Sequence, residues 1–479
     1  MLKIRKDIIG INQTFQTPYG TKQIEYFDWA ASGRLYKPIE EKISHLFGSF
    51  VANTHTETNV TGQTMTNAYH EALSIIKNHV NANDQDVIVT GGSGMTFVIN
   101  KLQRMLGLKI HEHFLNDVQL SEEDRPIVFV THMEHHSNHT SWVETIADVV
   151  VIPPDEKGLI SYEKFSELLE KYKGRKRLIG SFTACSNVTG IKTDYHRLAG
   201  MIHEYNGICI VDFSASAPYV SINMHPENPK EKLDAVVFSP HKFLGGPGSS
   251  GVLIFNSSLY SNKIPDQPGG GTVDWTNPWG EKSYYSDIEL REDGGTPGFL
   301  QAIKTALSIR LKESMGVSAI EKKENQLLQV LLEGLESIEG LYVLDGHIKD
   351  RLPIVSFYVE NIHYNLLVKL LNDVYGIQVR GGCSCAGTYG HFLLDIDKTT
   401  SKSITDKLDS GEKSVKPGWI RVSLHPTTTI DSVEFFINSL KDILKNITDY
   451  EKEYIYDSET NSFIHHKECL MDVKKWFDL

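Results

Sequence analysis

The stretch AVVFSPHKFLGGPGSSGVLIF at residues 235–255 decides how the chain folds. Its two ends, AVVFS and GVLIF, are apolar runs with the length and composition of buried β-strands. Between them stand Ser239, His241 and Lys242, followed by a glycine-rich turn. A lysine that ends an apolar strand lies where desolvation can lower the pKa of its ammonium group, which is the setting that a Schiff-base lysine needs. A lysine in a surface loop is the competing interpretation.

Five further apolar runs precede this stretch and alternate with amphipathic helical patterns. Strands that are apolar on both faces and separated by helices predict a mostly parallel sheet in an α/β domain. Functional side chains are then expected at the carboxyl ends of the strands. The five runs are VIVT (87–90), IVFVT (127–131), VVVIP (149–153), LIGSFTA (178–184) and ICIVDFS (208–214).

Two segments rich in glycine and proline, PDQPGGGTVDWTNPWG (265–280) and EDGGTPG (292–298), mark a domain junction. Beyond them, residues 299–338 have the apolar spacing of one long helix or a kinked pair, and the following runs are typical of a smaller α+β domain. We predict four parts: an N-terminal segment (1–26), a large domain (27–298), a small C-terminal domain (299–448) and an acidic C-terminal tail (449–479).

The composition argues against several classes of protein. The chain has 479 residues, 40% of them hydrophobic, and 48 basic against 61 acidic side chains give a net charge of −13. Such an acidic chain is poorly suited to bind a nucleic-acid backbone or an anionic membrane surface. The sequence has neither the apolar core of a secretory signal nor an apolar stretch of about 20 residues. We therefore expect a cytoplasmic protein without nucleic-acid or membrane partners.

Two further motifs follow strands of the predicted sheet. In VDFSASAP, Asp212 ends the strand before that of the lysine. A pyridoxal phosphate enzyme needs such an acid to keep its pyridine nitrogen protonated, although a helix N-cap would look the same. GGSGM (91–95) joins a strand to a helix, where free backbone N–H groups can bind a phosphate. It is neither a P-loop nor a dinucleotide fingerprint, and glycine placed for close packing is the alternative.

These motifs occur in order with FDWAASG, MEHHSN, SNVTG, GGGT and WIRVSLHPT, between residues 27 and 427. Together they resemble the class V aminotransferase family of fold-type I pyridoxal phosphate enzymes, in its cysteine desulfurase and selenocysteine lyase branch. The resemblance implies an α/β fold with a mostly parallel sheet in the large domain and a smaller α+β C-terminal domain. It also implies pyridoxal 5'-phosphate as cofactor and a homodimer with shared active sites.

The resemblance further implies roles for single residues. Lys242 matches the lysine that forms the Schiff base, Asp212 the acid that pairs with the pyridine nitrogen, and His135 the histidine that stacks on the cofactor ring. Arg421 looks like the arginine that binds the substrate carboxylate, a role that suits a bidentate donor, and Arg380 adds a second positive charge. The remaining matches are Asn187 near cofactor and substrate, the phosphate contacts Ser93, Gly94, Met95, Ser239 and His241, and Thr272, which reaches the phosphate across the dimer interface.

The motif RGGCSCAG (380–387) resembles the loop that carries the attacking cysteine of the desulfurases, with Cys385 in register and Cys383 additional. Arg380 and the glycine-rich backbone could favour a thiolate there. Two alternatives remain open: a C-x-C metal corner, although no second cysteine pair accompanies it, and two loop cysteines without a role. The five cysteines form no even disulfide framework, which is typical of a reducing compartment; the others are Cys185, Cys209 and Cys469.

Four histidines at 132, 135, 136 and 139 could also supply metal ligands, but the zincin patterns are absent. We therefore expect no metal, with His135 stacking on the cofactor and the other three lying around the cleft. His55 is a further residue that could reach the cleft.

Two departures from the family concern the reaction. Ala215 stands where the family usually has a glutamine that donates to the phenolic oxygen of the cofactor, and SLHPTTT replaces an asparagine-containing segment. We expect an enzyme that removes sulfur or selenium from cysteine or selenocysteine through a persulfide on Cys385, leaves alanine, and hands the sulfur to an acceptor protein. The alternatives are an aminotransferase or Cβ-lyase acting on another amino acid, and a non-catalytic scaffold that retains the fold.

Overall fold

The computed structural model describes residues 1–479 except 55–57, 470 and 479. The chain forms two compact units. We call residues 30–321 the large unit, and residues 1–29 together with 322–479 the small unit. The division into four parts from the sequence stays a prediction.

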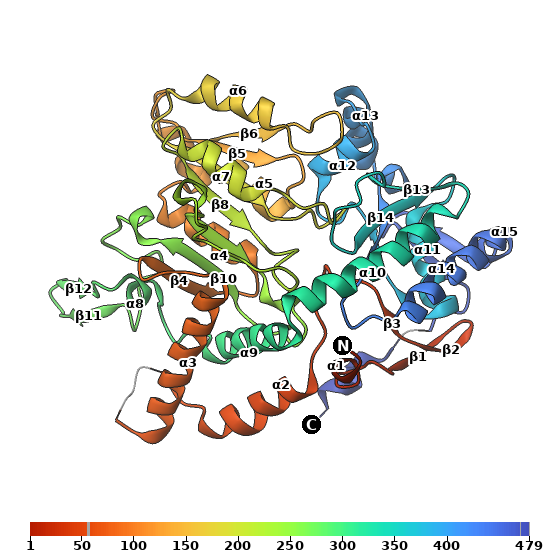
Figure 1. The fold of residues 1–479 in the computed structure, drawn as a ribbon, viewed down its shortest axis with the longest axis horizontal. Coiled ribbons are helices and arrows are strands. Elements are labelled where there is room, and N and C mark those ends of the chain that lie inside the picture. Colours follow the sequence, from red (N-terminus) through yellow and green to blue (C-terminus); the bar gives the residue numbers. More distant parts are fainter. Residues whose placement is uncertain (55–57, 470, 479) are drawn as a thin grey trace. The chain divides into compact units, whose positions relative to one another are not determined.

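The large unit is built on one seven-stranded sheet with the order β4-β10-β9-β8-β7-β5-β6 (Figure 1). Every apolar run that predicted a strand in this region belongs to it. Strand β10 runs antiparallel to both neighbours, whereas the pairs from β9 to β6 are parallel. This confirms the predicted mostly parallel α/β sheet. The strands are β4 (Asp86–Gly91), β5 (Ile127–Thr131), β6 (Asp148–Ile152), β7 (Leu178–Thr183), β8 (Ile208–Asp212), β9 (Ala235–Phe238) and β10 (Gly251–Asn256).

Helices connect these strands and shield their apolar side chains. Val98 and Leu102 of α4 pack with strand residues such as Val128 in one buried cluster. At the first turns, Ser161 and Asp194 accept backbone N–H bonds as N-caps of α6 and α7. The helices of this unit are α2 (Lys37–Glu41), α3 (Val60–His79), α4 (Met95–Met105), α5 (His136–Val143), α6 (Tyr162–Tyr172), α7 (Tyr195–His203), α8 (Ile288–Glu292) and α9 (Phe299–Met315), with a hairpin of β11 (Val273–Thr276) and β12 (Lys282–Tyr284).

The predicted helical stretch 299–338 is a pair of helices. Helix α9 ends at Met315, and α10 (Val317–Glu336) begins after Gly316, whose φ of 78° lies in the left-handed region that glycine tolerates. Ala72 of α3 packs against Ile303 and Ala306 of α9.

The small unit has a four-stranded antiparallel sheet in the order β13-β14-β17-β16. Helices α11 and α14 contribute Leu367, Leu370 and Phe436 to its core, together with Val355 and Val422 of the sheet. The strands and helices are β1 (Thr14–Thr17), β2 (Gly20–Gln23), β3 (Glu25–Tyr26), β13 (Leu341–Val343), β14 (Ile354–Val359), β15 (Ile377–Gln378), β16 (Arg380–Gly382), β17 (Trp419–Ser423), β18 (Tyr454–Asp457), β19 (Ser462–His465), α1 (Leu2–Arg5), α11 (Tyr364–Tyr375), α12 (Gly387–Leu393), α13 (Lys398–Asp409), α14 (Ile430–Lys445) and α15 (Ile447–Glu451).

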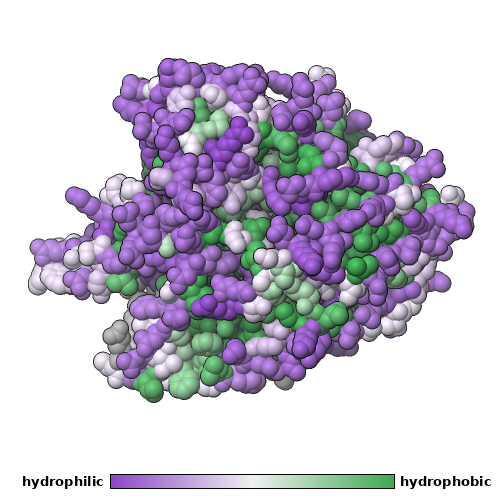
Figure 2. All heavy atoms as spheres, in the orientation of Figure 1, coloured by the Kyte–Doolittle hydropathy of each residue, from purple (hydrophilic) through white to green (hydrophobic). Residues whose placement is uncertain are grey.

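Two further pairs of short strands lie in the N-terminal and C-terminal parts of the small unit. Strand β3 pairs in parallel with β15, and β18 and β19 form a hairpin. Tyr454 of that hairpin is buried and donates a hydrogen bond to Asp373 of α11 at 2.9 Å. Hydrophilic side chains cover most of the face drawn in Figure 2. Within the part of the chain that the structure describes, no helix combines the length and apolar character needed to cross a bilayer.

Candidate active site

Asp212 lies at the carboxyl end of β8 and is 4% exposed. Its Oδ1 accepts a hydrogen bond from the backbone N–H of Ser214 at 2.8 Å. Burial raises the pKa of Asp212, while Ser214 and the positive charge of Lys242 act against that rise. The acid and the lysine predicted as a pair therefore lie close enough to interact electrostatically.

Lys242 ends the short 3-10 turn Pro240–Lys242 that follows β9, and it is half-buried. Two glycines let other backbone segments approach this turn. Gly33 donates its N–H to the carbonyl of His241 at 2.9 Å, and a Cβ on Gly33 would lie 1.9 Å from Phe243 O. A Cβ on Gly246 would lie 1.9 Å from Pro240 O. Only glycine fits at these two positions, so both motifs, FDWAASG and the glycine-rich turn, hold the lysine in place.

The predicted phosphate residues gather at the start of α4. The backbone N–H of Met95 donates to Ser239 Oγ at 2.8 Å, and His241 Nδ1–H donates to the carbonyl of Ser93 at 2.8 Å. A Cβ on Gly94 would lie 3.1 Å from both Ser239 Oγ and His241 Cε1. The backbone N–H groups and the positive end of this 11-residue helix make the place suited to an anion.

One hydroxyl connects this phosphate turn to the acid. Ser239 Oγ lies 3.3 Å from the hydroxyl of Ser214, which is the residue whose backbone binds Asp212. Ser93, Gly94, Met95, Asp212, Ser239, His241 and Lys242 therefore form one continuous group in the large unit.

His135 stands between β5 and α5 and caps the helix. Its Nδ1 accepts the N–H of Ser137 at 3.1 Å, so the proton of the neutral ring is on Nε2. Thr96 of α4 and Ser137 of α5 have hydroxyl oxygens 2.6 Å apart, which ties the two helix starts together.

Glu134, beside this histidine, was not predicted from the sequence. It is 2% exposed, and its Oε1 accepts bonds from the backbone N–H of Thr183 at 2.8 Å and from the Thr131 hydroxyl at 2.7 Å. Its Oε2 accepts a bond from Asn138 at 2.8 Å. Burial raises the pKa of Glu134 to about 8, and the negative charge of Asp212 adds to the rise. The signal in the sequence was an acid three positions after the end of an apolar run.

Asn187 and Thr272 occupy separate loops of the large unit. Asn187 lies in the loop after β7, one strand away from Asp212, and is 6% exposed. Thr272 is fully buried, and its hydroxyl donates to the carbonyl of Gly269 at 2.7 Å and accepts the Gly269 N–H at 3.1 Å. These bonds run within the GGGT turn itself.

The two arginines predicted to bind substrate lie in the small unit, on the neighbouring strands β16 and β17. Arg380 and Arg421 stand opposite each other in the register. Asp28 neutralises both, since it accepts from Arg421 Nη2 at 2.6 Å and from Arg380 Nε at 3.1 Å. Arg421 is 2% exposed, whereas Arg380 is exposed. Asp28 was not predicted, although an acid between Phe27 and Trp29 in FDWAASG was a signal for it.

The cysteine motif forms a tight turn in the small unit. Ala386 N–H donates to the carbonyl of Cys383 at 3.0 Å, and the two central residues, Ser384 and Cys385, have φ values of 51° and 58°. A turn with positive φ at both central positions is of type I′. The indole N–H of Trp419 donates to Ser384 Oγ at 3.3 Å in the interior, while Cys385 is exposed and Cys383 is partly exposed.

Other motif residues have structural partners. His132 is buried, donates from Nε2 to the carbonyl of Gly158 at 3.2 Å, and burial lowers its pKa to about 4. In SLHPTTT, the ring of His425 stacks on Trp29 at 4.2 Å, and burial lowers the pKa of His425 to about 3. Ala215 is buried. Among the residues with a described position, no three His, Cys, Asp or Glu side chains are arranged to hold a metal ion. His55 lies outside the described residues.

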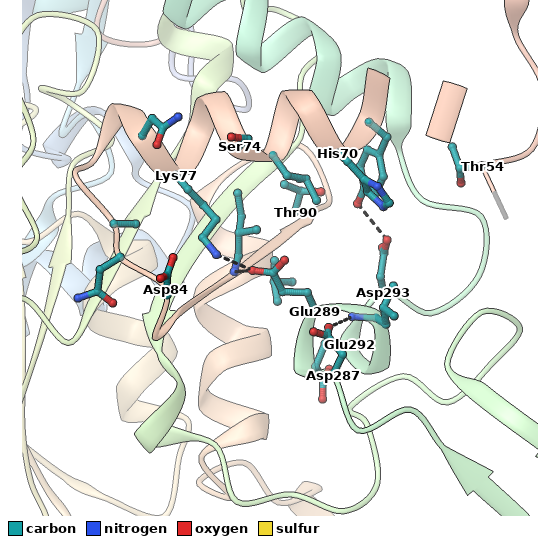
Figure 3. A pocket seen from close by; sticks show the side chains of 18 residues that line it. Thr54, His70, Ser74, Lys77, Asp84, Thr90, Asp287, Glu289, Glu292 and Asp293 are labelled. Carbon is teal, nitrogen blue, oxygen red and sulfur yellow. Dashed lines mark hydrogen bonds and ion pairs between the residues drawn. The ribbon is translucent and has the colours of Figure 1, made fainter. Parts of the chain in front are cut away.

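A cavity of about 530 Å³ lies beside the edge strand β4, lined by α3, β4 and α8 (Figure 3). Glu289 Oε1 accepts there from Lys77 Nζ and from the backbone N–H of Ile88, each at 3.0 Å, and Tyr69 donates to Asp293 at 3.0 Å. Of the site residues predicted from the sequence whose positions are described, none lines this cavity. The residues predicted to act thus form two groups, one in each unit.

Comparison with known proteins gives one family and one fold. The model of the aminotransferase class-V family matches residues 25–436. A probable cysteine desulfurase of Halalkalibacterium halodurans is 28% identical over 383 residues, which is 79% of this chain and 87% of that protein. A probable cysteine desulfurase of Pyrococcus abyssi is 25% identical over 441 residues, which is 89% of this chain and 96% of that protein.

Two solved structures have the same fold. The apo structure of a cysteine desulfurase from Thermococcus onnurineus NA1 superposes with a TM-score of 0.71 at 23% identity, covering 93% of this chain and 98% of that one. A cysteine desulfurase from Escherichia coli superposes with a TM-score of 0.67 at 22% identity, covering 88% of this chain and 94% of that one.

Proposed function

The chain belongs to the aminotransferase class-V family, and we propose that it is a pyridoxal 5'-phosphate-dependent enzyme of the cysteine desulfurase type. The observation that carries the desulfurase assignment is the exposed thiol of Cys385 on its tight turn. The reaction would convert cysteine to alanine and leave the sulfur on Cys385 as a persulfide.

The residues of the large unit fit the cofactor of this family. A side chain at Gly94 would crowd Ser239 and His241, so the absence of a Cβ keeps room for a phosphate beside the start of α4. Asp212 is a buried acid next to Lys242, and a protonated pyridine nitrogen would favour its ionised form. Lys242 would hold the cofactor's aldehyde carbon, and His135 would lie on the ring. When bound, the cofactor withdraws electrons from the α-carbon of the amino acid.

In this proposal each side chain has one task. The amine of Lys242 accepts the α-proton once the amino acid is bound. Arg421 and Arg380 bind the substrate carboxylate and share their charge with Asp28. The thiolate of Cys385 then attacks the substrate sulfur. A new sulfur–sulfur bond forms as the carbon–sulfur bond breaks, and its electron pair stays on the carbon that becomes the methyl group of alanine.

Ala215 favours a second candidate, an aminotransferase or Cβ-lyase acting on another amino acid. Its buried methyl group cannot donate the hydrogen bond that the family glutamine gives to the phenolic oxygen of the cofactor. In this case the exposed cysteine has no part in the reaction.

Product analysis with cysteine variants separates the two candidates. The protein is first loaded with the cofactor. A Schiff base on Lys242 should absorb at about 420 nm, and Lys242→Ala should lose this band. The loaded protein is then supplied with cysteine. We expect alanine from the wild type and from Cys469→Ser, an exposed cysteine outside both groups, and none from Cys385→Ser. Amino-group transfer to a keto acid that Cys385→Ser retains would favour the aminotransferase.

The finer features are part of the same proposal. We infer that selenocysteine is a second substrate, that the sulfur passes to an acceptor protein, and that the enzyme is a cytoplasmic homodimer with shared active sites. The hydroxyl of Thr272 is buried and bonded within its own turn, so Thr272 is not part of this proposal. Light scattering of the purified protein tests the dimer.

A further inference from the structure

The turn Cys383–Ala386 carries two cysteines of the small unit, at its first and third positions. It is closed by the hydrogen bond from Ala386 N–H to Cys383 O at 3.0 Å. Consecutive Cα atoms are about 3.8 Å apart and an extended chain advances at most about 3.6 Å per residue, so the first and third Cα of this folded turn lie less than about 7 Å apart. A disulfide requires a Cα separation of about 4.4–6.8 Å. Cys383 and Cys385, the first and third residues, therefore stand at a distance that a sulfur–sulfur bond can span.

The backbone of this turn is held in a conformation that these residues rarely adopt. Neither Ser384 nor Cys385 is a glycine, yet both have positive φ, which costs free energy and persists only where the surroundings impose it. The surroundings are the buried indole of Trp419, which donates to Ser384 Oγ at 3.3 Å, and the buried methyl group of Ala386. The side chain between the two cysteines is thus anchored inward at 7% exposure, while both cysteines keep contact with solvent.

From this geometry we propose that Cys383 is a resolving thiol: it attacks the persulfide that Cys385 carries, closes a Cys383–Cys385 disulfide and releases the sulfur as hydrosulfide. This inference rests on the proposed function, which supplies the persulfide. The thiolate of Cys383 forms a bond to Sγ of Cys385, and the outer sulfur leaves with the electron pair of the bond that breaks. The sulfur of Cys383 is oxidised, the outer sulfur is reduced and Sγ of Cys385 keeps its oxidation state, so this step needs no other oxidant. A small-molecule thiol must then reduce the disulfide before the next turnover.

The other cysteines are less suited to this role. Cys185 and Cys209 are buried in the large unit. Cys469 is exposed, but it lies 84 positions beyond Cys385 along the chain and outside the turn. It therefore serves as the matched control, since it is an accessible thiol of the same unit.

Mass spectrometry of the thiols tests this step on the full chain loaded with cofactor. The protein receives one equivalent of cysteine per chain and no other thiol, so that no excess thiol remains to reduce the disulfide. The reaction is quenched with iodoacetamide, the peptide with residues 383–385 is analysed, and hydrosulfide and alanine are measured. For the wild type and Cys469→Ser we expect that peptide to carry no alkyl group and to be two hydrogens lighter than its dithiol form. We also expect one hydrosulfide to be released per chain. Cys383→Ser should instead accumulate an alkylated persulfide on Cys385 and release at least tenfold less hydrosulfide.

Two outcomes would overturn the inference: a wild type that accumulates the Cys385 persulfide as Cys383→Ser does, or a persulfide found on Cys383. A second way of loading separates this failure from failure of the proposed function. Inorganic polysulfide places a persulfide on accessible thiols without the cofactor. If cysteine yields no alanine, the proposed function fails, and the polysulfide-treated protein still reveals whether Cys383 closes the disulfide.

Discussion

Replacing Glu134 by glutamine should change how the stability of the large unit depends on pH. The carboxyl group is 2% exposed, and burial raises its pKa from 4.5 to about 8, with the charge of Asp212 contributing. Glutamine has nearly the same shape but does not titrate in this range. The difference between the two proteins therefore isolates the proton of this single group.

The direction in which stability changes with pH follows from whether the folded or the unfolded chain holds the proton more tightly. Below about pH 4.5 the carboxyl is protonated in both folded and unfolded chains, and its full contribution to stability is present. As the pH rises from 4.5 to about 8, the unfolded chain releases the proton and the folded chain retains it, so the free energy of unfolding falls. At about 1.36 kcal/mol per pH unit, this interval corresponds to an upper limit of about 5 kcal/mol. We expect at least about 2 kcal/mol of it to appear as a difference between wild type and Glu134→Gln.

Hydrogen exchange measured on peptides of β5 and β7 is the suitable assay, because a chain with two units has no single free energy of unfolding. Wild type and Glu134→Gln are compared at each pH from about 5.5 to about 8.5, so that the intrinsic exchange rate cancels. Glu163→Gln, an exposed glutamate of α6, is the control and should follow the wild type at every pH.

A constant difference between wild type and Glu134→Gln across this range would refute the reasoning. It would mean that the carboxyl is ionised in the folded protein throughout. The bonds that its two oxygens accept from Thr131, Thr183 and Asn138 would then outweigh the cost of burying the charge.

Three further substitutions have expected outcomes. Gly33→Ala would place a methyl group against the backbone of the turn that carries Lys242, the proposed Schiff-base lysine, and should weaken cofactor binding at least tenfold in an absorbance titration, with no such loss in Ser32→Ala. Asp28→Asn leaves the buried guanidinium of Arg421 without its anion and should destabilise the small unit by about 3 kcal/mol, measured by hydrogen exchange of peptides from β17; a change below about 1 kcal/mol would contradict the buried pair. Lys101 Nζ lies 2.7 Å from buried Glu292, so Lys101→Met leaves that carboxylate without its positive partner and should lower the free energy of unfolding of the large unit by about 3–5 kcal/mol. Adding Glu292→Gln should restore a large part of this loss.

Much of the fold and part of the candidate site could be predicted from local patterns. Apolar runs bounded by turn residues predict strands because burial on both faces imposes the same composition wherever the strand lies. All seven runs from 87 to 255 became strands of one sheet. Asp212 and Lys242 were predicted together because Asp212 ends one strand and Lys242 comes shortly after the next, and parallel strands present their carboxyl ends at the same edge. The cysteine motif was also found from the local sequence, although its tight turn and left-handed backbone were not predicted.

The tertiary structure alone decided which charges compensate one another. Asp28 binds Arg421 across 393 positions of sequence, and the backbone N–H of Thr183 binds Glu134 across 49. It also decided that β10 runs antiparallel within the sheet, because a strand buried on both faces has the same apolar pattern in either direction. The sequence by itself determined the strands, since these depend on the pattern of neighbouring residues, and it pointed to Lys242 and Asp212 as residues at the ends of two of them. The pairing and the protonation of buried acids depend on distant groups and on the loss of water around them, which only the folded chain brings about.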